Sequence, residues 1–373
     1  MLLPDVTVFL NSSRPHPRFI LANRDMMRAA LVTSWGSPPT YTTTADLPPP
    51  SPTQIRLRVL AAGVHRLVLA RAAGTHYTST TLPHLPGADG VGEDPTTGRR
   101  YYFSALATGS FAEFVNVERA MLAPLPETQT ADADADAVAV AVAAYTNPVM
   151  SSWMALAART GTAPTTAAGA GAGAGAGTVR EPGFSVVILG VTSASGRVAV
   201  DVARSKGAGR VVGIARNAAA MAEMELDERI VLLAGGGGDS GETTDWSRLG
   251  EVDVVLDYVY GPPVVELLEA LPASAREVQV VHVGSVSGDG DIRLPGAVLR
   301  GKRIAIRGAG PGSWTMAEYA KELGGMVGVS SGLKADNVTV VGFKDVEKGW
   351  REAGIGKKRV VFVSEDLLSR DKT

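Results

Sequence analysis

The sequence predicts an α/β protein in which a β-rich, barrel-like domain precedes a doubly wound parallel sheet. Two observations predict the parallel sheet. Residues 184–217 follow the order strand, turn of small residues, helix and second strand. Continuous Val, Ile and Leu runs of strand length then recur, as is typical of parallel strands buried on both faces. The six predicted strands span residues 186–189, 211–215, 230–233, 252–256, 278–283 and 304–306.

The third observation is a change of pattern before residue 145. Residues 54–60 (QIRLRVL) alternate polar and apolar side chains, as in a half-buried antiparallel strand, and turns rich in Pro and Gly follow. The Ala-rich residues 132–144 predict a helix. Because proline cannot donate a backbone hydrogen bond, we expect Asn147-Pro148 to end that helix before a further one at 151–158.

The turn between the first parallel strand and its helix predicts a pyrophosphate site. Such a turn directs several backbone N–H groups, and the positive end of the helix dipole, at one point. Val191 and Ser193 stand where the G-x-G-x-x-G pattern has its first two glycines, so a βαβ unit that binds no ligand is the alternative. The predicted contacts are Gly190, Ser193, Ala194, Ser195, Gly196 and Arg197.

The end of the second parallel strand indicates which dinucleotide is bound. NAD-binding proteins place an acidic residue there, about 20 positions after the turn, to bind the ribose 2′-hydroxyl. This chain has Arg216 and Asn217 and no carboxylate. A cation at this place suits a 2′-phosphate, so the predicted cofactor is NADPH.

Composition limits the other possibilities. The 373 residues suit two domains, and a net charge of −2 without a basic block makes nucleic acid an unexpected partner. No apolar run is long enough to predict a membrane span. Residues 1–26 are predicted to be a disordered extension of a cytoplasmic protein, with a mitochondrial signal as the alternative. The Ala/Gly-rich residues 165–177 are expected to form a flexible insertion, and the glycine run 235–238 a loose loop.

Several segments together resemble the zinc-free, quinone-oxidoreductase-like branch of the medium-chain dehydrogenase/reductase family. They are AAGVHRLVLARAAGTHY (61–77), LPHLPGADGVG (82–92), NPVMSSWMAL (147–156), VVLDYVYG (254–261) and GAGPGS (308–313). The resemblance implies a GroES-like catalytic domain from residues 27–145 and 313–373. It also implies a Rossmann domain for NADP(H) over residues 146–312, with the active site in the cleft between them.

The resemblance also implies site residues. Tyr77 and His65 become candidates to donate a hydrogen bond to a substrate oxygen, although a packing tyrosine and a buried structural histidine are the alternatives. Ser151, Gly284 and Ser285 correspond to positions near the nicotinamide. Asp257 either contacts a ribose or ends its strand, and His282 is expected in the core. Gly87-Ala88-Asp89 stands where zinc-dependent relatives have Gly-His-Glu, and the chain has no cysteine, so no metal site is predicted.

The predicted function is therefore NADPH-dependent hydride transfer to a quinone, enone or related carbonyl without zinc. An enoyl reductase that serves a biosynthetic pathway is an alternative within the same chemistry. A cofactor-binding protein with little turnover is the alternative from another class. The expected partner is a small-molecule substrate, and the resemblance favours a homodimer formed through the cofactor domain.

Overall fold

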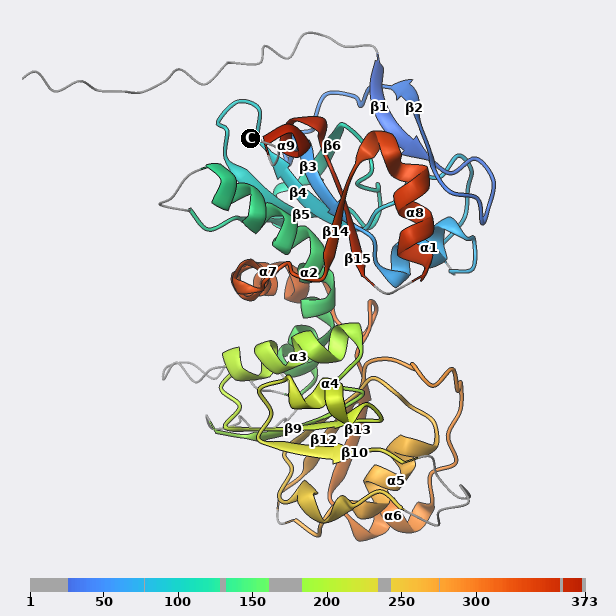
Figure 1. The fold of residues 1–373 in the computed structure, drawn as a ribbon, viewed down its shortest axis with the longest axis vertical. Coiled ribbons are helices and arrows are strands. Elements are labelled where there is room, and N and C mark those ends of the chain that lie inside the picture. The colour runs from blue at the N-terminus through green and yellow to red at the C-terminus, as the bar shows by residue number, and fades with distance from the viewer. Residues whose placement is uncertain are drawn as a thin grey trace, which may run out of the picture.

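The computed structural model describes residues 26–76, 78–127, 132–160, 183–233, 243–274, 276–355 and 358–370. The expected N-terminal extension, the Ala/Gly insertion 165–177, the glycine run 235–238 and Tyr77 lie outside these residues. Two sheet-based bodies are joined by a long helix, and the red C-terminal elements lie among the blue and teal N-terminal ones (Figure 1). Among the described residues, no helix is both long and apolar enough to cross a membrane.

The lower body in Figure 1 contains the predicted parallel sheet. Its six strands follow the order β10-β9-β8-β11-β12-β13, and every pairing is parallel. Their bounds are β8 Ser185–Leu189, β9 Arg210–Ala215, β10 Glu228–Val231, β11 Val254–Asp257, β12 Val278–His282 and β13 Ile304–Gly308. The doubly wound sheet is thus confirmed, although β10 begins two residues before its predicted start.

Helices cover both faces of this sheet. On one face, alternate strand residues such as Val186 and Ile188 share a core with α3 (Ala194–Ser205). On the other, Val187 and Leu189 share a core with α5 (Pro262–Ala270) and α6 (Gly296–Gly301). A short helix, α4 (Ala218–Ala222), follows β9. Burial of both faces explains why these strands are apolar without alternation.

The second sheet combines strands from the two ends of the chain. It has seven strands, with the order β14-β15-β3-β4-β5-β7 and with β6 pairing β3. Their bounds are β3 Gln54–Gly63, β4 Asp89–Glu93, β5 Arg100–Ser104, β6 Phe114–Glu118, β7 Leu122–Pro124, β14 Val338–Gly342 and β15 Arg359–Val363. A separate hairpin consists of β1 (Met26–Leu31) and β2 (Thr40–Ala45), and α1 (Arg66–Ala72) follows β3. The C-terminal segment therefore completes a sheet that the N-terminal segment begins.

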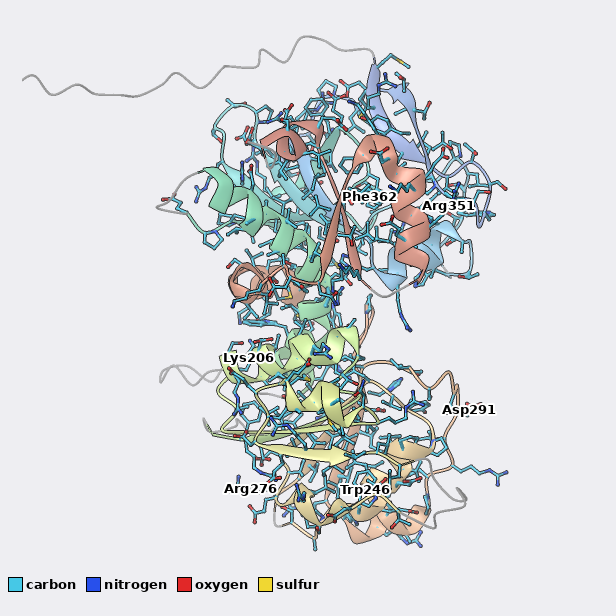
Figure 2. All side chains as sticks on the ribbon, viewed as in Figure 1. Lys206, Trp246, Arg276, Asp291, Arg351 and Phe362 are labelled. Atoms are coloured by element: carbon cyan, nitrogen blue, oxygen red, sulfur yellow. The ribbon has the colours of Figure 1, made fainter. Side chains whose placement is uncertain are left out.

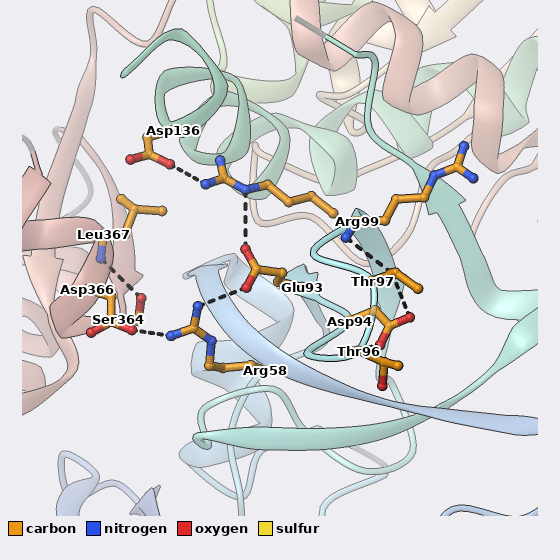
Figure 3. Close-up of polar contacts among 11 residues, drawn as sticks. Arg58, Glu93, Asp94, Thr96, Thr97, Arg99, Asp136, Ser364, Asp366 and Leu367 are labelled. Carbon is orange, nitrogen blue, oxygen red and sulfur yellow. Dashed lines mark hydrogen bonds and ion pairs between the residues drawn. The ribbon is translucent and has the colours of Figure 1, made fainter. Parts of the chain in front are cut away.

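Ion pairs hold this arrangement together (Figure 3). The guanidinium of Arg58 on β3 contacts both Glu93 on β4 and Asp366 on α9 (Glu365–Arg370). Arg100 on β5 contacts Glu93 and, at 2.7 Å, Asp136 of the long helix. Each partner comes from a different element, so the network links β3, β4 and β5 to two helices.

An aromatic cluster lies beneath the same sheet. The ring of Phe111 packs against Phe343, Trp350 and Phe362 at centroid distances of 5.9, 6.1 and 5.3 Å. Trp350 lies on α8 (Val346–Ile355), and Figure 2 places Phe362 beside that helix. Phe111 and Phe362 are fully buried. Residues far apart in the sequence therefore share one core.

The long helix α2 corrects one expectation. It runs without a break from Asp132 to Arg159, with Pro148 inside it. Proline removes one backbone donor of the helix, and the nearby Thr146 and Ser151 hydroxyls donate to Val142 O and Pro148 O. Residues on both sides of Pro148, such as Val142 and Met154, are fully buried. Tertiary packing of both halves therefore outweighs the local preference to break the helix.

A buried cation fastens α2 to the helices on either side of it. The ammonium of Lys206, at the end of α3, lies 3.6 Å from the centroid of the Trp153 ring on α2. It also contacts Glu322 at 3.3 Å on α7 (Met316–Gly332), and Trp153 Nε1 donates to the same carboxylate. Burial lowers the pKa of Lys206, while Glu322 opposes that shift. Figure 2 shows Lys206 near the junction of the two bodies.

Candidate active site

The register of the parallel sheet aligns the ends of its central strands. Leu189 pairs with Ile214 on one side and with Asp257 on the other, and Asp257 pairs with His282. The residues that follow these four strand ends therefore lie side by side at the C-terminal end of the strands, which forms one edge of the sheet. The predicted residues Gly190–Arg197, Arg216 and Asn217, Asp257, and Gly284 and Ser285 all belong to this edge. Ligands of doubly wound sheets bind at the carboxyl ends of the strands, so this edge is the candidate cofactor site.

The turn that follows β8 is shorter than the segment Gly190–Arg197 that was predicted to contact the phosphates. It covers Gly190 to Ser193, and α3 already begins at Ala194. The Ser193 hydroxyl caps the helix by accepting from Gly196 N at 3.0 Å. Ala194 and Ser195 are the first two residues of the helix, so their N–H groups have no acceptor one turn earlier. They point out of the helix end, where an anion is stabilised.

Two glycines keep this turn tight. Gly190 has a φ of +89°, and a Cβ there would lie 2.8 Å from Val259 Cγ2. A Cβ on Gly196 would lie only 2.3 Å from the backbone oxygen of Gly190. The bare Cα of Gly196 thus lets the first helical turn approach the strand end, which is the packing role of the third glycine in dinucleotide turns.

The end of β9 presents a cation to solvent. Arg216 and Asn217 are both exposed. The Asn217 side-chain oxygen caps α4 by accepting from Ala220 N at 3.0 Å. Arg197, one turn into α3, is also exposed. Arg216 is therefore the cation at the place where a 2′-phosphate is expected.

Asp257 at the end of β11 is occupied by protein groups. It is 1% exposed, and its Oδ1 accepts from the backbone N–H of Val259 and Tyr260. Its Oδ2 lies 3.4 Å from His282 Nδ1. These contacts favour its role in ending the strand over a ribose contact.

His282 differs from the prediction, because it is half-exposed at the sheet edge and not in the core. Its side chain is 35% exposed, and its ring lies 4.3 Å from that of Tyr260, centroid to centroid. Tyr260 has a φ of +62°, which strains a residue with a side chain. Gly284 is half-buried beside His282, and Ser285 is exposed.

Ser151 joins the long helix to this edge. Its hydroxyl lies 3.3 Å from the hydroxyl of Tyr258, which follows β11. Tyr258 is 3% exposed, and burial raises its pKa to about 12. It therefore stays neutral as a hydrogen-bond partner. Tyr258 belongs to the candidate range Asp257–Tyr260 at the carboxyl ends of the strands, although no separate role was predicted for it.

Arg359 is a second cation near the turn, after Arg216, and no sequence pattern predicted it. It is the first residue of β15, in the other sheet, yet its guanidinium donates to Ala194 O at the start of α3. The guanidinium also lies 5.4 Å from the Tyr145 ring centroid. Burial lowers the pKa of Arg359, and Tyr145 opposes that shift. Arg359 thereby links the second sheet to the first residue of α3, directly after the turn.

His65, the candidate donor in the second sheet, belongs to a buried polar chain. It precedes α1 and is 6% exposed, and its Nε2 lies 3.1 Å from Asp89 Oδ1. Asp89 Oδ2 accepts from the Tyr102 hydroxyl at 2.9 Å, and that hydroxyl lies 3.4 Å from the Tyr319 hydroxyl. Tyr77 cannot be placed, because it lies outside the described residues. Among the residues that the structure covers, no group of three His, Asp or Glu side chains could hold a metal ion.

Comparisons with known proteins identify the family. No family model matches the chain. A protein of Emericella nidulans named "Probable NADPH-dependent quinone reductase tdiC" is 37% identical over 373 residues, covering 90% of this chain and all of that protein. The fold and its dinucleotide edge define an oxidoreductase of the medium-chain dehydrogenase/reductase type. The chain belongs to the zinc-free, quinone-reductase-like branch of that family.

Solved structures share the fold. The quinone oxidoreductase of Thermus thermophilus, studied also with NADPH, is 24% identical with a TM-score of 0.59, covering 90% of this chain and 100% of that one. A mycobacterial quinone oxidoreductase is 17% identical with a TM-score of 0.65, covering 90% and 99% of the two chains. At these identities the likeness concerns the arrangement of the two sheets.

Proposed function

We propose that this protein is an NADPH-dependent oxidoreductase that transfers a hydride to a quinone or a related conjugated carbonyl. The observation that carries the proposal is the juxtaposition of the tight turn at Gly190–Ser193 with Arg216 along one sheet edge. The relative named as an NADPH-dependent quinone reductase supports the choice of substrate. We further propose that residues 27–145 and 313–373 form the catalytic domain and residues 146–312 the cofactor domain.

The residues present fit NADPH. A Cβ on Gly196 would clash with the backbone oxygen of Gly190, so glycine lets the helix start lie against the strand end, where the N–H groups of Ala194 and Ser195 have no acceptor within the helix. Arg359 adds positive charge from the second sheet. We assign the pyrophosphate to this turn, the 2′-phosphate to Arg216, and the nicotinamide end to Ser151, Gly284 and Ser285.

Bound NADPH supplies the hydride, and the protein supplies orientation, exclusion of water and electrostatics. A quinone accepts hydride readily because the negative charge that develops is delocalised onto oxygen. A donor near that oxygen stabilises the charge further. We assign this role to His65, with Tyr77 as the second candidate, while the neutral Tyr258 hydroxyl fixes Ser151 beside the cofactor edge.

A parallel fluorescence titration with NADPH and NADH tests the cofactor assignment. A charge-assisted hydrogen bond contributes about 1.5–3 kcal/mol, so Arg216→Ala should weaken NADPH binding about 10- to 100-fold. Binding of NADH should change little, because NADH has no 2′-phosphate. The matched control is Arg276→Ala. Arg276 is exposed and contacts Asp253, which precedes β11, so it lies at the N-terminal end of the strands, away from Arg216. A preference of the wild-type protein for NADH would refute the arginine argument.

We also propose that the protein is a homodimer formed through β13. This strand is the last of its sheet, and Ile306 on it is 44% exposed. An exposed apolar edge strand is a template for pairing with a second chain. In light scattering coupled to gel filtration, we expect a dimer that Ile306→Lys converts to monomer. Val231→Lys, on the opposite edge strand β10, should leave it intact, and a wild-type monomer would contradict the proposal.

A further inference from the structure

Asp89 is a buried carboxylate whose neighbours set it apart from the other acids of its sheet. It is 2% exposed, and among the described residues its ion-pair partner is His65, with no Arg or Lys in contact. Burying a carboxylate is costly unless hydrogen bonds compensate. The described contacts to Asp89 come from His65 and Tyr102.

The tyrosines of this network are fixed as protonated groups. Burial, and then the charge of Asp89, raises the pKa of Tyr102 well above its usual value. Burial raises the pKa of Tyr319 to about 12. Tyr102 therefore donates to Asp89 Oδ2, and Oδ1 is left for His65. This arrangement places a proton on His65 Nε2, because a carboxylate only accepts.

The other ring nitrogen of His65 is the unexplained group. His65 Nδ1 is buried and has no hydrogen-bond partner among the described residues. In other enzymes, a carboxylate that holds one imidazole nitrogen fixes the tautomer and stabilises the imidazolium, so that the second nitrogen exchanges a proton with a ligand. The same geometry is present here, with Nδ1 as the exchanging atom.

The long helix connects His65 with the cofactor edge. A Cβ on Gly63 would lie 2.3 Å from Ala143 O and 2.8 Å from His65 Cε1, so the imidazole lies beside Ala143 of α2. Ala143, Asn147 and Ser151 are spaced by four residues and therefore share one face of α2. Ser151 contacts Tyr258. One helix face thus runs about 12 Å from the imidazole to the assigned nicotinamide end.

We propose that Asp89, supported by Tyr102, is the positioning residue that holds His65 as proton donor to the reduced quinone oxygen. The inference rests on the proposed function. The hydride forms an O–H bond at one carbonyl oxygen of the quinone, and an electron pair moves through the conjugated ring onto the other carbonyl oxygen. The Nδ1–H bond of the His65 imidazolium then breaks and an O–H bond forms, which gives the hydroquinone. The neutral imidazole that remains keeps its proton on Nε2 and still donates it to Asp89.

Asp89→Asn tests this role, because the change keeps the size of the side chain and removes the charge. General acid catalysis contributes about 10²–10⁴-fold, so loss of positioning should lower kcat by about 10- to 100-fold. The Kd for NADPH should stay unchanged. The pH profile of kcat should also change in Asp89→Asn, because the carboxylate that accepts from His65 Nε2 is lost. The titratable groups around His65 are Asp89 on β4, Tyr102 on β5 and Tyr319 on α7.

Two further variants separate positioning from a merely structural role. Asp94 is also buried, directly after β4, and it binds Thr96 and Thr97 within its own loop (Figure 3). Asp94→Asn is therefore the matched control and should leave kcat and the pH profile unchanged. If Asp89 acts through His65, Asp89→Asn should have no further effect on kcat in the His65→Asn background.

The outcomes are distinguishable. If the wild-type protein oxidises NADPH with a quinone but Asp89→Asn does so at the same rate and with the same pH profile, the positioning role is overturned. Additive losses in the double variant would overturn it too. If the wild-type protein shows no such turnover, the proposed function itself fails. Should Asp89→Asn not fold, nitrogen-15 NMR of histidine in the wild-type protein decides, since the role requires the His65 proton on Nε2.

Discussion

Gly196→Ala is expected to abolish measurable NADPH binding and to lower the stability of the protein. The new Cβ would lie 2.3 Å from Gly190 O and 2.9 Å from Val191 Cα, and both are backbone atoms. Neither can yield without moving the turn away from the helix end. Overpacking of this kind costs about 1–3 kcal/mol. The displaced N–H groups of Ala194 and Ser195 would no longer meet at one point, so we expect affinity to fall by about 100-fold or more.

Gly324→Ala is the matched control for this substitution. Gly324 lies inside α7, it is exposed, and nothing lies within 4 Å of a Cβ built there. Alanine in a helix interior stabilises by about 0.5–1 kcal/mol relative to glycine. NADPH titration by fluorescence and urea unfolding check both variants. If Gly196→Ala binds NADPH as the wild-type protein does, the turn is not the pyrophosphate site.

Phe111→Ala is expected to cause the largest loss of stability among the core substitutions considered. Phe111 is 0% exposed, and its ring meets Phe343, Trp350 and Phe362 of the C-terminal segment. Truncating a buried phenylalanine costs about 3–5 kcal/mol in the free energy of unfolding. Urea unfolding measures the loss. Met316→Ala, at a residue that is 50% exposed, should change the free energy by no more than about 0.5 kcal/mol.

A double variant shows whether this cluster unites the two ends of the chain. Phe111→Ala and Phe362→Ala remove partners of one contact, so their effects should not add, with a coupling of about 0.5–3 kcal/mol. Coupling of that size supports a catalytic domain built from residues 27–145 and 313–373. Additive effects would mean that the C-terminal segment is stabilised independently of Phe111.

The sequence was sufficient for the elements that local patterns specify. Continuous apolar runs predicted all six parallel strands, and the turn of small residues was correctly placed between β8 and α3. Strand ends were less accurate, as at β10, because pairing with the neighbouring strand decides where a strand stops. The predicted end of the helix at Asn147-Pro148 was wrong for a related reason, since the local sequence does not show that α2 is buried on both sides of Pro148.

The remaining site residues depend on long-range contacts. Arg359 reaches Ala194 from 165 positions away, and only the pairing of β15 with β3 brings it there. Asp89 was recognised as a departure from a zinc ligand pattern, but its contacts with His65 and Tyr102 require the fold. The expectation that His282 lies in the core was wrong, because its side chain is 35% exposed beside Tyr260, although Asp257 in the same register row is buried. The role of Tyr77 stays a prediction.

The most direct test of the account is the steady-state oxidation of NADPH and of NADH by the wild-type protein with a small quinone as acceptor. We predict hydroquinone formation at a kcat/KM for NADPH about 10- to 100-fold above that for NADH, because we assign Arg216 to the 2′-phosphate, which NADH lacks. Arg216→Ala should remove most of this preference. Tight NADPH binding without turnover of any quinone or enone would contradict the account and would leave a cofactor-binding protein with little catalytic activity.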